Sequence, residues 1–190
     1  NGIWASYADI ENNHIEKGPD QNNDEWAIGH GDYNVIKNNT IIGMRDGIQV
    51  DSKWDNVIEN NHIETRNYGV YANNANGEHI IRNNEFIKYT TDGDWFVYAT
   101  NMDNIIIEDN TFVGSGGSGF YINNTAADIN RNLLVTPGRG IQIENQAGSE
   151  INQNTIISSN GDYGIHISNL SAPTVYSNII QGFQVGIHAD

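Results

Sequence analysis

The chain carries three short apolar runs that recur in a fixed order and are separated by polar turn residues. One run consists of an Asn, a variable residue and then Ile, Leu or Phe, as in Asn39-Thr40-Ile41 and Asn61-His62-Ile63. Successive copies of this Asn are 26, 22, 23, 26, 22, 22 and 24 residues apart. The repeated residues are Asn13, Asn39, Asn61, Asn84, Asn110, Asn132, Asn154 and Asn178. A period of this length indicates a solenoid in which each repeat is one structural unit.

Two further runs complete each repeat. One contains a Gly followed by an apolar, a variable and an apolar residue, as in Gly47-Ile48-Gln49-Val50, and the other is β-branched, as in Val57-Ile58. These runs alternate between apolar and variable positions, and no helical period is sustained over ten residues. The pattern therefore predicts an all-β fold, a right-handed parallel β-helix of about eight coils with three short strands per coil. We expect one domain over residues 1–190, forming part of a longer chain.

Stacking of these coils determines which residues become neighbours. Paired strands lie about 4.8 Å apart, so equivalent residues of successive coils lie side by side. The repeated Asn is predicted to adopt a left-handed backbone conformation at a turn. Its side-chain amide is predicted to bond the equivalent residues one coil above and below. We therefore assign these Asn residues a structural role.

The repeated Asn-Asn-X-Ile and Gly-Ile-X-Ile sequences resemble those of the right-handed parallel β-helix superfamily of pectate-lyase-like proteins. They are most similar to its Asn-rich group, which is described as carbohydrate-binding and sugar-hydrolase repeats. The resemblance covers essentially the whole chain and implies a secreted or cell-surface protein whose partner is a polysaccharide. It does not specify an activity, because the fold supports many functions. A fragment resembling a polygalacturonase motif, Gly29-His30-Gly31, lacks the paired aspartates that precede it in those enzymes.

The glycine-marked strand is predicted to point one variable residue per coil toward solvent. Tyr71, Tyr98 and Tyr121 occupy this position in consecutive coils, and Ala27 is its predicted occupant near the N-terminus. Sugar rings can pack on such aromatic side chains while polar neighbours bond the hydroxyl groups. The alternative is that these residues are cross-strand pairs that only stabilise the sheet. The predicted substrate-binding residues are Gln49, Asp51, Tyr71, Asn73, Trp95, Tyr98 and Tyr121.

Extra residues collect at one corner of the repeat, in 16–25, 88–94 and 158–163. Loops carried by a rigid scaffold are common places for active sites. Two coils separate Asp46 from Asp92 and Asp94, which corresponds to roughly 9.6 Å, near the upper limit for the acid and base of an inverting glycosidase. A lyase would instead use Lys53 or Arg66 as its base. The predicted catalytic residues are Asp46, Arg66, Asp92 and Asp94, and the alternative is that they are solvated turn charges.

Charge and composition narrow the possible partners. The chain has 9 Lys and Arg against 24 Asp and Glu, a net charge of −15, which disfavours nucleic acid and anionic membranes. No apolar run is long enough for membrane insertion. We expect no required cofactor, although Ca²⁺ suits a carboxylate-rich surface. His166 and His188 face outward on adjacent coils near Asp190 and are candidates for binding a transition metal, provided a third ligand is in reach.

Three functions fit these observations. The first is a polysaccharide hydrolase or lyase that acts along the exposed sheet. The second is a non-catalytic glycan-binding or adhesin module that uses the tyrosines, and the third is a structural spacer. Converging charges in a cleft would favour the enzyme, and an aromatic face without them would favour binding.

Overall fold

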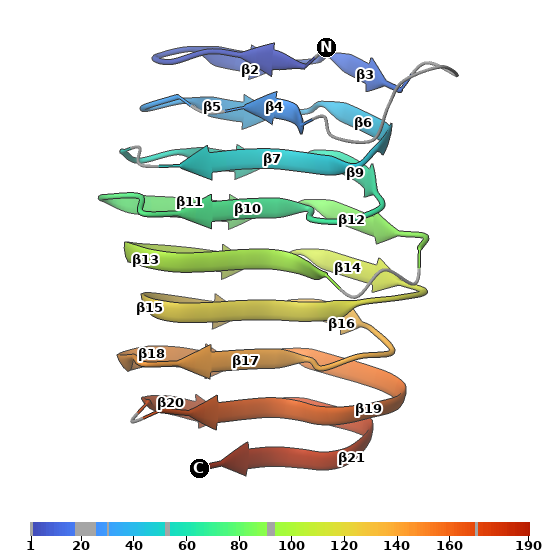
Figure 1. The fold of residues 1–190 in the computed structure, drawn as a ribbon, viewed down its shortest axis with the longest axis vertical. Helices are drawn as coiled ribbons and strands as arrows, with labels where there is room; N and C mark the ends of the chain where they lie inside the picture. The colour runs from blue at the N-terminus through green and yellow to red at the C-terminus, as the bar shows by residue number, and fades with distance from the viewer. Residues whose placement is uncertain (1, 18–25, 30, 52–53, 91–93, 170) are drawn as a thin grey trace.

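A computed structural model describes residues 2–17, 26–29, 31–51, 54–90, 94–169 and 171–190. Every regular element of this described part is a β-strand, and the paired strands run parallel. Figure 1 shows the coils stacked in one column, with the chain running from one end of the stack to the other. The predicted parallel β-helix is therefore confirmed.

The coils form three sheet faces. The Asn-marked face contains β3 (His14–Glu16), β6 (Thr40–Met44), β9 (His62–Thr65), β12 (Glu85–Lys88), β14 (Thr111–Gly114), β16 (Leu133–Val135) and the first parts of β19 (Thr155–Ser168) and β21 (Ile179–Ala189). The glycine-marked face contains β1 (Ile3–Trp4), β4 (Trp26–Gly29), β7 (Asp46–Asp51), β10 (Val70–Asn73), the first parts of β13 (Trp95–Glu108) and β15 (Ser118–Asn130), β17 (Ile141–Glu144), and the last parts of β19 and β21. The third face contains β2 (Asp9–Glu11), β5 (Val35–Lys37), β8 (Val57–Glu59), β11 (Glu78–Arg82), the last parts of β13 and β15, β18 (Ala147–Asn152) and β20 (Ala172–Tyr176).

The predicted three short strands per coil are joined end to end in part of the stack. β13 and β15 each run through the glycine-marked face and onto the third face without interruption. A single left-handed residue makes the bend, Asn101 at φ 55° in β13 and Asn124 at φ 47° in β15. Because one such residue can turn the chain, pairing with the next coil continues on both sides of the corner.

The core consists of inward side chains that stack in register. On the glycine-marked face, Ile48 lies opposite Val70, and Val70 lies opposite Val97. On the Asn-marked face, the rings of Phe86 and Phe112 stack with centroids 4.6 Å apart. These five side chains are almost completely buried, so the core is a set of continuous apolar columns along the axis.

The repeated Asn residues form a ladder inside one corner. Asn61 Nδ2 lies 2.9 Å from Asn84 Oδ1 of the next coil and 2.8 Å from the Ile36 carbonyl oxygen of the coil before. Asn61 Oδ1 accepts from the Asn39 backbone N–H at 2.9 Å. The predicted side-chain ladder is confirmed.

The predicted backbone conformation of the ladder Asn is wrong by one residue. The left-handed position is occupied by the preceding residue, for example Asn60 at φ 56° and Asn83 at φ 54°. The preceding residue makes the turn, and the ladder side chain then points inward. The same position holds Arg131 and Gln153 further along the chain, so Asn is not required there.

The Gly mark reflects close approach between coils. A Cβ atom placed on Gly119 would lie 2.1 Å from the carbonyl oxygen of Gly140 in the next coil. Real Cβ atoms do not come this close to an oxygen, so any side chain here would push the two coils apart. The Gly is therefore a packing requirement of this corner.

Candidate functional site

The three predicted tyrosines lie in one column on the glycine-marked face. Tyr71 pairs with Tyr98 and Tyr98 with Tyr121 in the strand register. Both pairs have ring centroids 5.1 Å apart, with interplanar angles of 2° and 20°. Parallel rings at this separation overlap in the offset-stacked arrangement. Each ring therefore covers part of its neighbour, so the column presents ring edges and only part of the ring faces.

Other aromatic side chains extend this column on both sides. Trp26 lies 5.7 Å from Tyr71, and Trp95 lies 5.4 Å from Tyr121, measured between ring centroids. Tyr68 contacts Tyr71 and Tyr98 at 5.4 and 5.7 Å. The sequence patterns did not single out Tyr68 because it precedes Gly69, outside the alternating part of the run. We call these six residues the aromatic cluster: Trp26, Tyr68, Tyr71, Trp95, Tyr98 and Tyr121.

The prediction that Ala27 points outward is wrong. Ala27 is fully buried, and Ile28 pairs with Ile48 in the core column. The outward position of this coil, in register with Trp4, is Gly29. The difference of two residues, between Ala27 and Gly29, arose because this coil lacks the Gly that marks the strand start elsewhere.

Two of the predicted catalytic carboxylates meet at Tyr68. The Tyr68 backbone N–H donates to Asp46 Oδ1 at 3.2 Å, and its hydroxyl lies 3.4 Å from Asp94 Oδ1. Asp46 is buried, and this burial raises its pKa, while the Tyr68 N–H and neighbouring Arg45 oppose the rise. Burial and the nearby Asp94 raise the pKa of Tyr68 to about 12. A buried carboxyl beside a more accessible carboxylate is an arrangement that can separate acid and base roles.

The other predicted catalytic residues are not placed at this meeting point. Asp92 and the alternative base Lys53 lie outside the described residues. The Arg66 carbonyl accepts from Thr90 Oγ1 at 2.6 Å. Burial raises the pKa of Tyr89, and the neighbouring Arg66 guanidinium opposes this rise. Arg66 thus lies beside residues 89 and 90, at the start of the corner segment 88–94.

The predicted polar residues border the tyrosine column. Gln49 pairs with Tyr71, and Asp51 pairs with Asn73. Asn73 Oδ1 accepts from Thr100 Oγ1 at 2.7 Å, so part of its bonding capacity is already used. The face beside the rings is therefore polar, and some of its hydrogen-bonding groups already bond one another.

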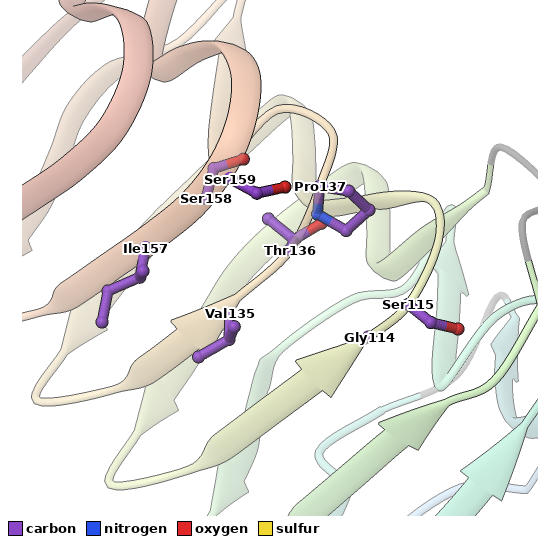
Figure 2. A pocket seen from close by; sticks show the side chains of 8 residues that line it. All are labelled: Gly114, Ser115, Val135, Thr136, Pro137, Ile157, Ser158 and Ser159. Atoms are coloured by element: carbon purple, nitrogen blue, oxygen red, sulfur yellow. The ribbon is translucent and has the colours of Figure 1, made fainter.

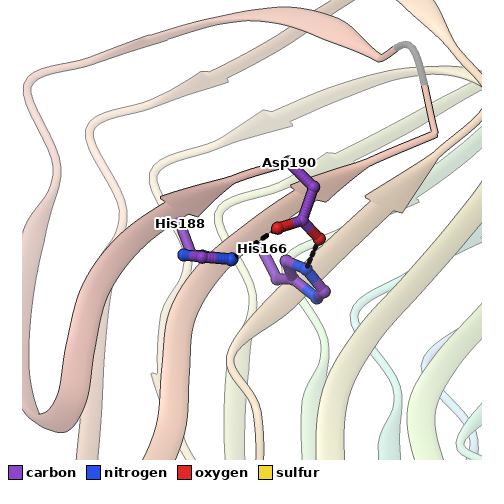
Figure 3. Close-up of side chains that lie close together, drawn as sticks. All are labelled: His166, His188 and Asp190. Atoms are coloured by element: carbon purple, nitrogen blue, oxygen red, sulfur yellow. Dashed lines mark hydrogen bonds and ion pairs between the residues drawn. The ribbon is translucent and has the colours of Figure 1, made fainter.

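A second site lies at the last coils of the same face. His166 and His188 pair in the register of β19 and β21. Their Nε2 atoms lie 3.1 and 2.6 Å from the two oxygens of the Asp190 carboxylate, as Figure 3 shows. One ligand atom from each of the three residues lies within 4.8 Å of the others. The third ligand that the sequence left open is therefore Asp190.

Neighbouring side chains hold the two imidazoles. The Tyr163 ring packs on His166 at 4.8 Å and on His188 at 4.9 Å between centroids. Arg139 lies over the Tyr163 ring at 5.6 Å. Hydrogen bonds from His166 and His188 hold the pKa of Asp190 below its usual value. Buried His166 Nδ1 has no hydrogen-bond partner in the described part of the chain.

A cleft of about 350 Å³ opens at another part of the surface. Figure 2 shows its lining, which comes from β14, β16, β19 and the turns that follow the first two, and includes Ser115, Thr136, Pro137 and Ser158. Every lining residue is uncharged. The cleft therefore supplies neither a carboxylate pair nor metal ligands.

Comparison with known proteins gives a family but no characterised relative. No curated protein and no solved structure matches the chain. Among the described residues, no helix is long and apolar enough to span a membrane. A family model described as periplasmic copper-binding protein (NosD) matches residues 11–189. Because this match covers nearly the whole chain, the protein belongs to the NosD family.

Proposed function

We propose that this protein binds a copper ion outside the cytoplasm through His166, His188 and Asp190. The observation that carries the proposal is the convergence of these three ligand groups within 4.8 Å. The family description, periplasmic copper-binding protein, supports both the metal and the compartment. Copper(II) forms the most stable complexes among the first-row divalent ions at a given nitrogen and oxygen site.

The donor set fits a divalent transition metal. Imidazole nitrogen and carboxylate oxygen bind such ions at about 2.0–2.2 Å. Both histidines already point at one carboxylate, whose lowered pKa keeps it ionised, as a ligand must be. His166 Nδ1 is buried, so Nε2, which faces Asp190, is the nitrogen that would bind the metal. Three protein ligands leave a coordination position for water or another molecule.

Calorimetric titration of the untagged protein with Cu²⁺ tests this proposal. We expect one ion per chain in the wild type and binding at least about tenfold weaker in His188→Ala, because even loss of an outer-shell partner costs that much. His14→Ala is the matched control, because His14 is also exposed and bonded to a carboxylate, that of Glu16, on another face. Equal affinity in the wild type and His188→Ala would refute the site.

A second candidate function, glycan binding with hydrolysis at the aromatic cluster, is favoured by the meeting of Asp46 and Asp94 at Tyr68. Asp46, whose pKa is raised, would act as the acid and Asp94 as the base. The aromatic cluster and its polar border would hold the sugar chain, and the acidic surface could recruit Ca²⁺. Elimination, with Arg66 or Lys53 as the base, remains the alternative to hydrolysis.

A glycan array followed by product analysis on each bound glycan tests this second function. We expect Tyr71→Ala to lose binding and Asp46→Asn to retain binding but lose cleavage. Binding without any product in the wild type would reduce the proposal to a non-catalytic glycan-binding module. Absence of binding to every glycan would reject both forms and leave the aromatic cluster a structural column.

A further inference from the structure

The copper site proposed above contains no soft ligand. The chain has no Cys, and its two Met residues, Met44 and Met102, are buried in other coils, on β6 and β13. The three converging groups are two imidazoles and one carboxylate. Thiolate and thioether sulfur are the ligands that favour Cu(I), whereas nitrogen and oxygen donors in a tetragonal arrangement suit Cu(II).

The arrangement of the histidines also disfavours Cu(I). A Cu(I) ion bound by two imidazoles alone prefers them on opposite sides of the metal. Here the rings lie side by side on adjacent coils, with centroids 5.4 Å apart, and Figure 3 shows both directed at the same carboxylate. Tyr163 packs on both rings and restricts their rotation. The site therefore presents its ligands from one side.

The negative charge of the site and of the chain also favours Cu(II) over Cu(I). Asp190 accepts hydrogen bonds from both histidines, and the chain as a whole carries −15. The attraction of a fixed anionic site doubles with the charge of the cation. A divalent ion gains more from this surface than a monovalent one.

We propose that the site formed by His166, His188 and Asp190 is selective for Cu(II) over Cu(I), so that reduction releases the metal. The inference rests on the proposed copper-binding function and adds a mode of release to it. Ascorbate, as the reductant, gives one electron to each Cu(II), releases one proton to the buffer and becomes the ascorbyl radical. The resulting Cu(I) leaves, while the histidine and aspartate side chains are not changed chemically.

Two measurements on the untagged protein test the selectivity. Electron paramagnetic resonance follows Cu²⁺ as it binds, and coupling to two imidazole nitrogens is expected. Ascorbate is then added without oxygen, together with the Cu(I) chelator bicinchoninate, and the copper retained by the protein is measured after ultrafiltration. We expect the Cu(II) form to survive ultrafiltration and at least about tenfold less copper to be retained after reduction.

A substitution that introduces sulfur gives the matching gain of function. Asp190→Met replaces the carboxylate by a thioether, so this variant should retain copper after reduction where the wild type does not. Asp190 is exposed, so the replacement should not disturb folding, and circular dichroism checks this. His14→Ala serves as the control and should release copper on reduction as the wild type does.

The outcomes separate the inference from the function on which it rests. Cu(II) binding with release on reduction, reversed in Asp190→Met, supports both. Retention of Cu(I) as tight as that of Cu(II) overturns the selectivity while the copper site stands. Failure of the wild type to bind Cu²⁺ at all overturns the proposed function and the inference with it.

Discussion

At the scale of single residues, the ladder Asn is the most constrained position in the repeat. Asn84 Oδ1 accepts from the Asn61 backbone and side-chain nitrogens, both at 2.9 Å, and Asn84 Nδ2 donates to the Ile58 carbonyl at 2.8 Å. All of these groups are buried. Asn84 Nδ2 also donates to Asn110 Oδ1 of the following coil at 3.0 Å, so the side chain satisfies polar groups of both neighbouring coils as well as its own.

Asn84→Ala should destabilise the protein by about 3 kcal/mol or more. Each buried polar group left without a partner costs about 1–3 kcal/mol, and this change leaves at least two. Urea unfolding followed by circular dichroism measures the loss. Asn83→Gly is the control, because Asn83 is exposed at φ 54° and Gly adopts this conformation without strain. A loss below about 1 kcal/mol for Asn84→Ala would contradict the ladder's role.

Asp46 should make stability fall as pH rises. Its pKa is raised above 3.8 in the folded state, so the folded chain holds this proton after the unfolded chain has lost it. This contribution is fully present below pH 3.8 and is lost as pH rises through the folded pKa. Asp46→Asn keeps an oxygen for the Tyr68 N–H but cannot ionise. The variant should gain stability relative to the wild type between pH 3 and pH 7.

Thermal unfolding across that pH range checks the sign. If Asp46→Asn instead loses stability relative to the wild type as pH rises, then the charged form of Asp46 is the stabilised one, and its proposed role as an acid fails. Asp51→Asn is the matched control, because Asp51 lies on the same strand and is more exposed.

Residue positions were predictable from spacing, whereas contacts made by side chains were not. The register placed His166 beside His188 and Tyr71 beside Tyr98, because residues one repeat apart become neighbours. The spacing did not reveal that both imidazoles turn toward Asp190, since the packing of Tyr163 holds them there. Side-chain direction depends on neighbours that the repeat does not encode.

At the scale of elements, the aromatic column couples three strands. Tyr98 in β13 stacks on Tyr71 in β10 and on Tyr121 in β15. Tyr98 also contacts the Tyr68 ring edge-on. Tyr98→Ala should therefore lose three aromatic pairs, each worth about 0.5–1.5 kcal/mol, and so about 1.5–4.5 kcal/mol in total. Tyr98→Phe keeps the aromatic ring and its contacts with the neighbouring tyrosines, so this variant should remain near wild-type stability. A large loss in Tyr98→Phe would show that the hydroxyl, rather than the stacking, provides the stabilisation.

Two features of the strands could not be predicted from the sequence pattern. Apolar alternation located all three faces, but it could not show that β13 and β15 continue around a corner. The corner needs only one left-handed residue, and Asn101 is not distinguished in the sequence from the many other Asn residues. A second inner ladder was missed for a similar reason, because its members differ in type: Asn34 Oδ1, Asn56 Oδ1 and His79 Nδ1 accept backbone N–H groups in turn.

At the scale of the whole molecule, the parallel stack joins the two candidate sites into one face. Tyr121 donates to Glu144 at 2.9 Å, Gln142 also bonds Glu144, and Arg139 bonds Gln142 and covers Tyr163 beside the histidines. These contacts form a continuous chain from the aromatic cluster to the proposed metal ligands. The repeat explains this continuity, since every coil adds its outward residue to the same column.

The net charge of −15 is a property of the whole stack and should make its stability depend on salt. Screening acts over about 30 Å at 0.01 M salt, which spans several coils, and over about 10 Å at 0.1 M. Repulsion among acidic residues is therefore strong at low salt and weak at high salt. Exposed ion pairs such as Arg131–Asp109 oppose this trend, but each is worth only about 0–1 kcal/mol.

The thermal midpoint should rise with NaCl and equally with KCl, since screening does not distinguish the two cations. A midpoint that falls with salt would mean that ion pairs between coils outweigh the repulsion, and a rise with only one salt would indicate a specific cation site.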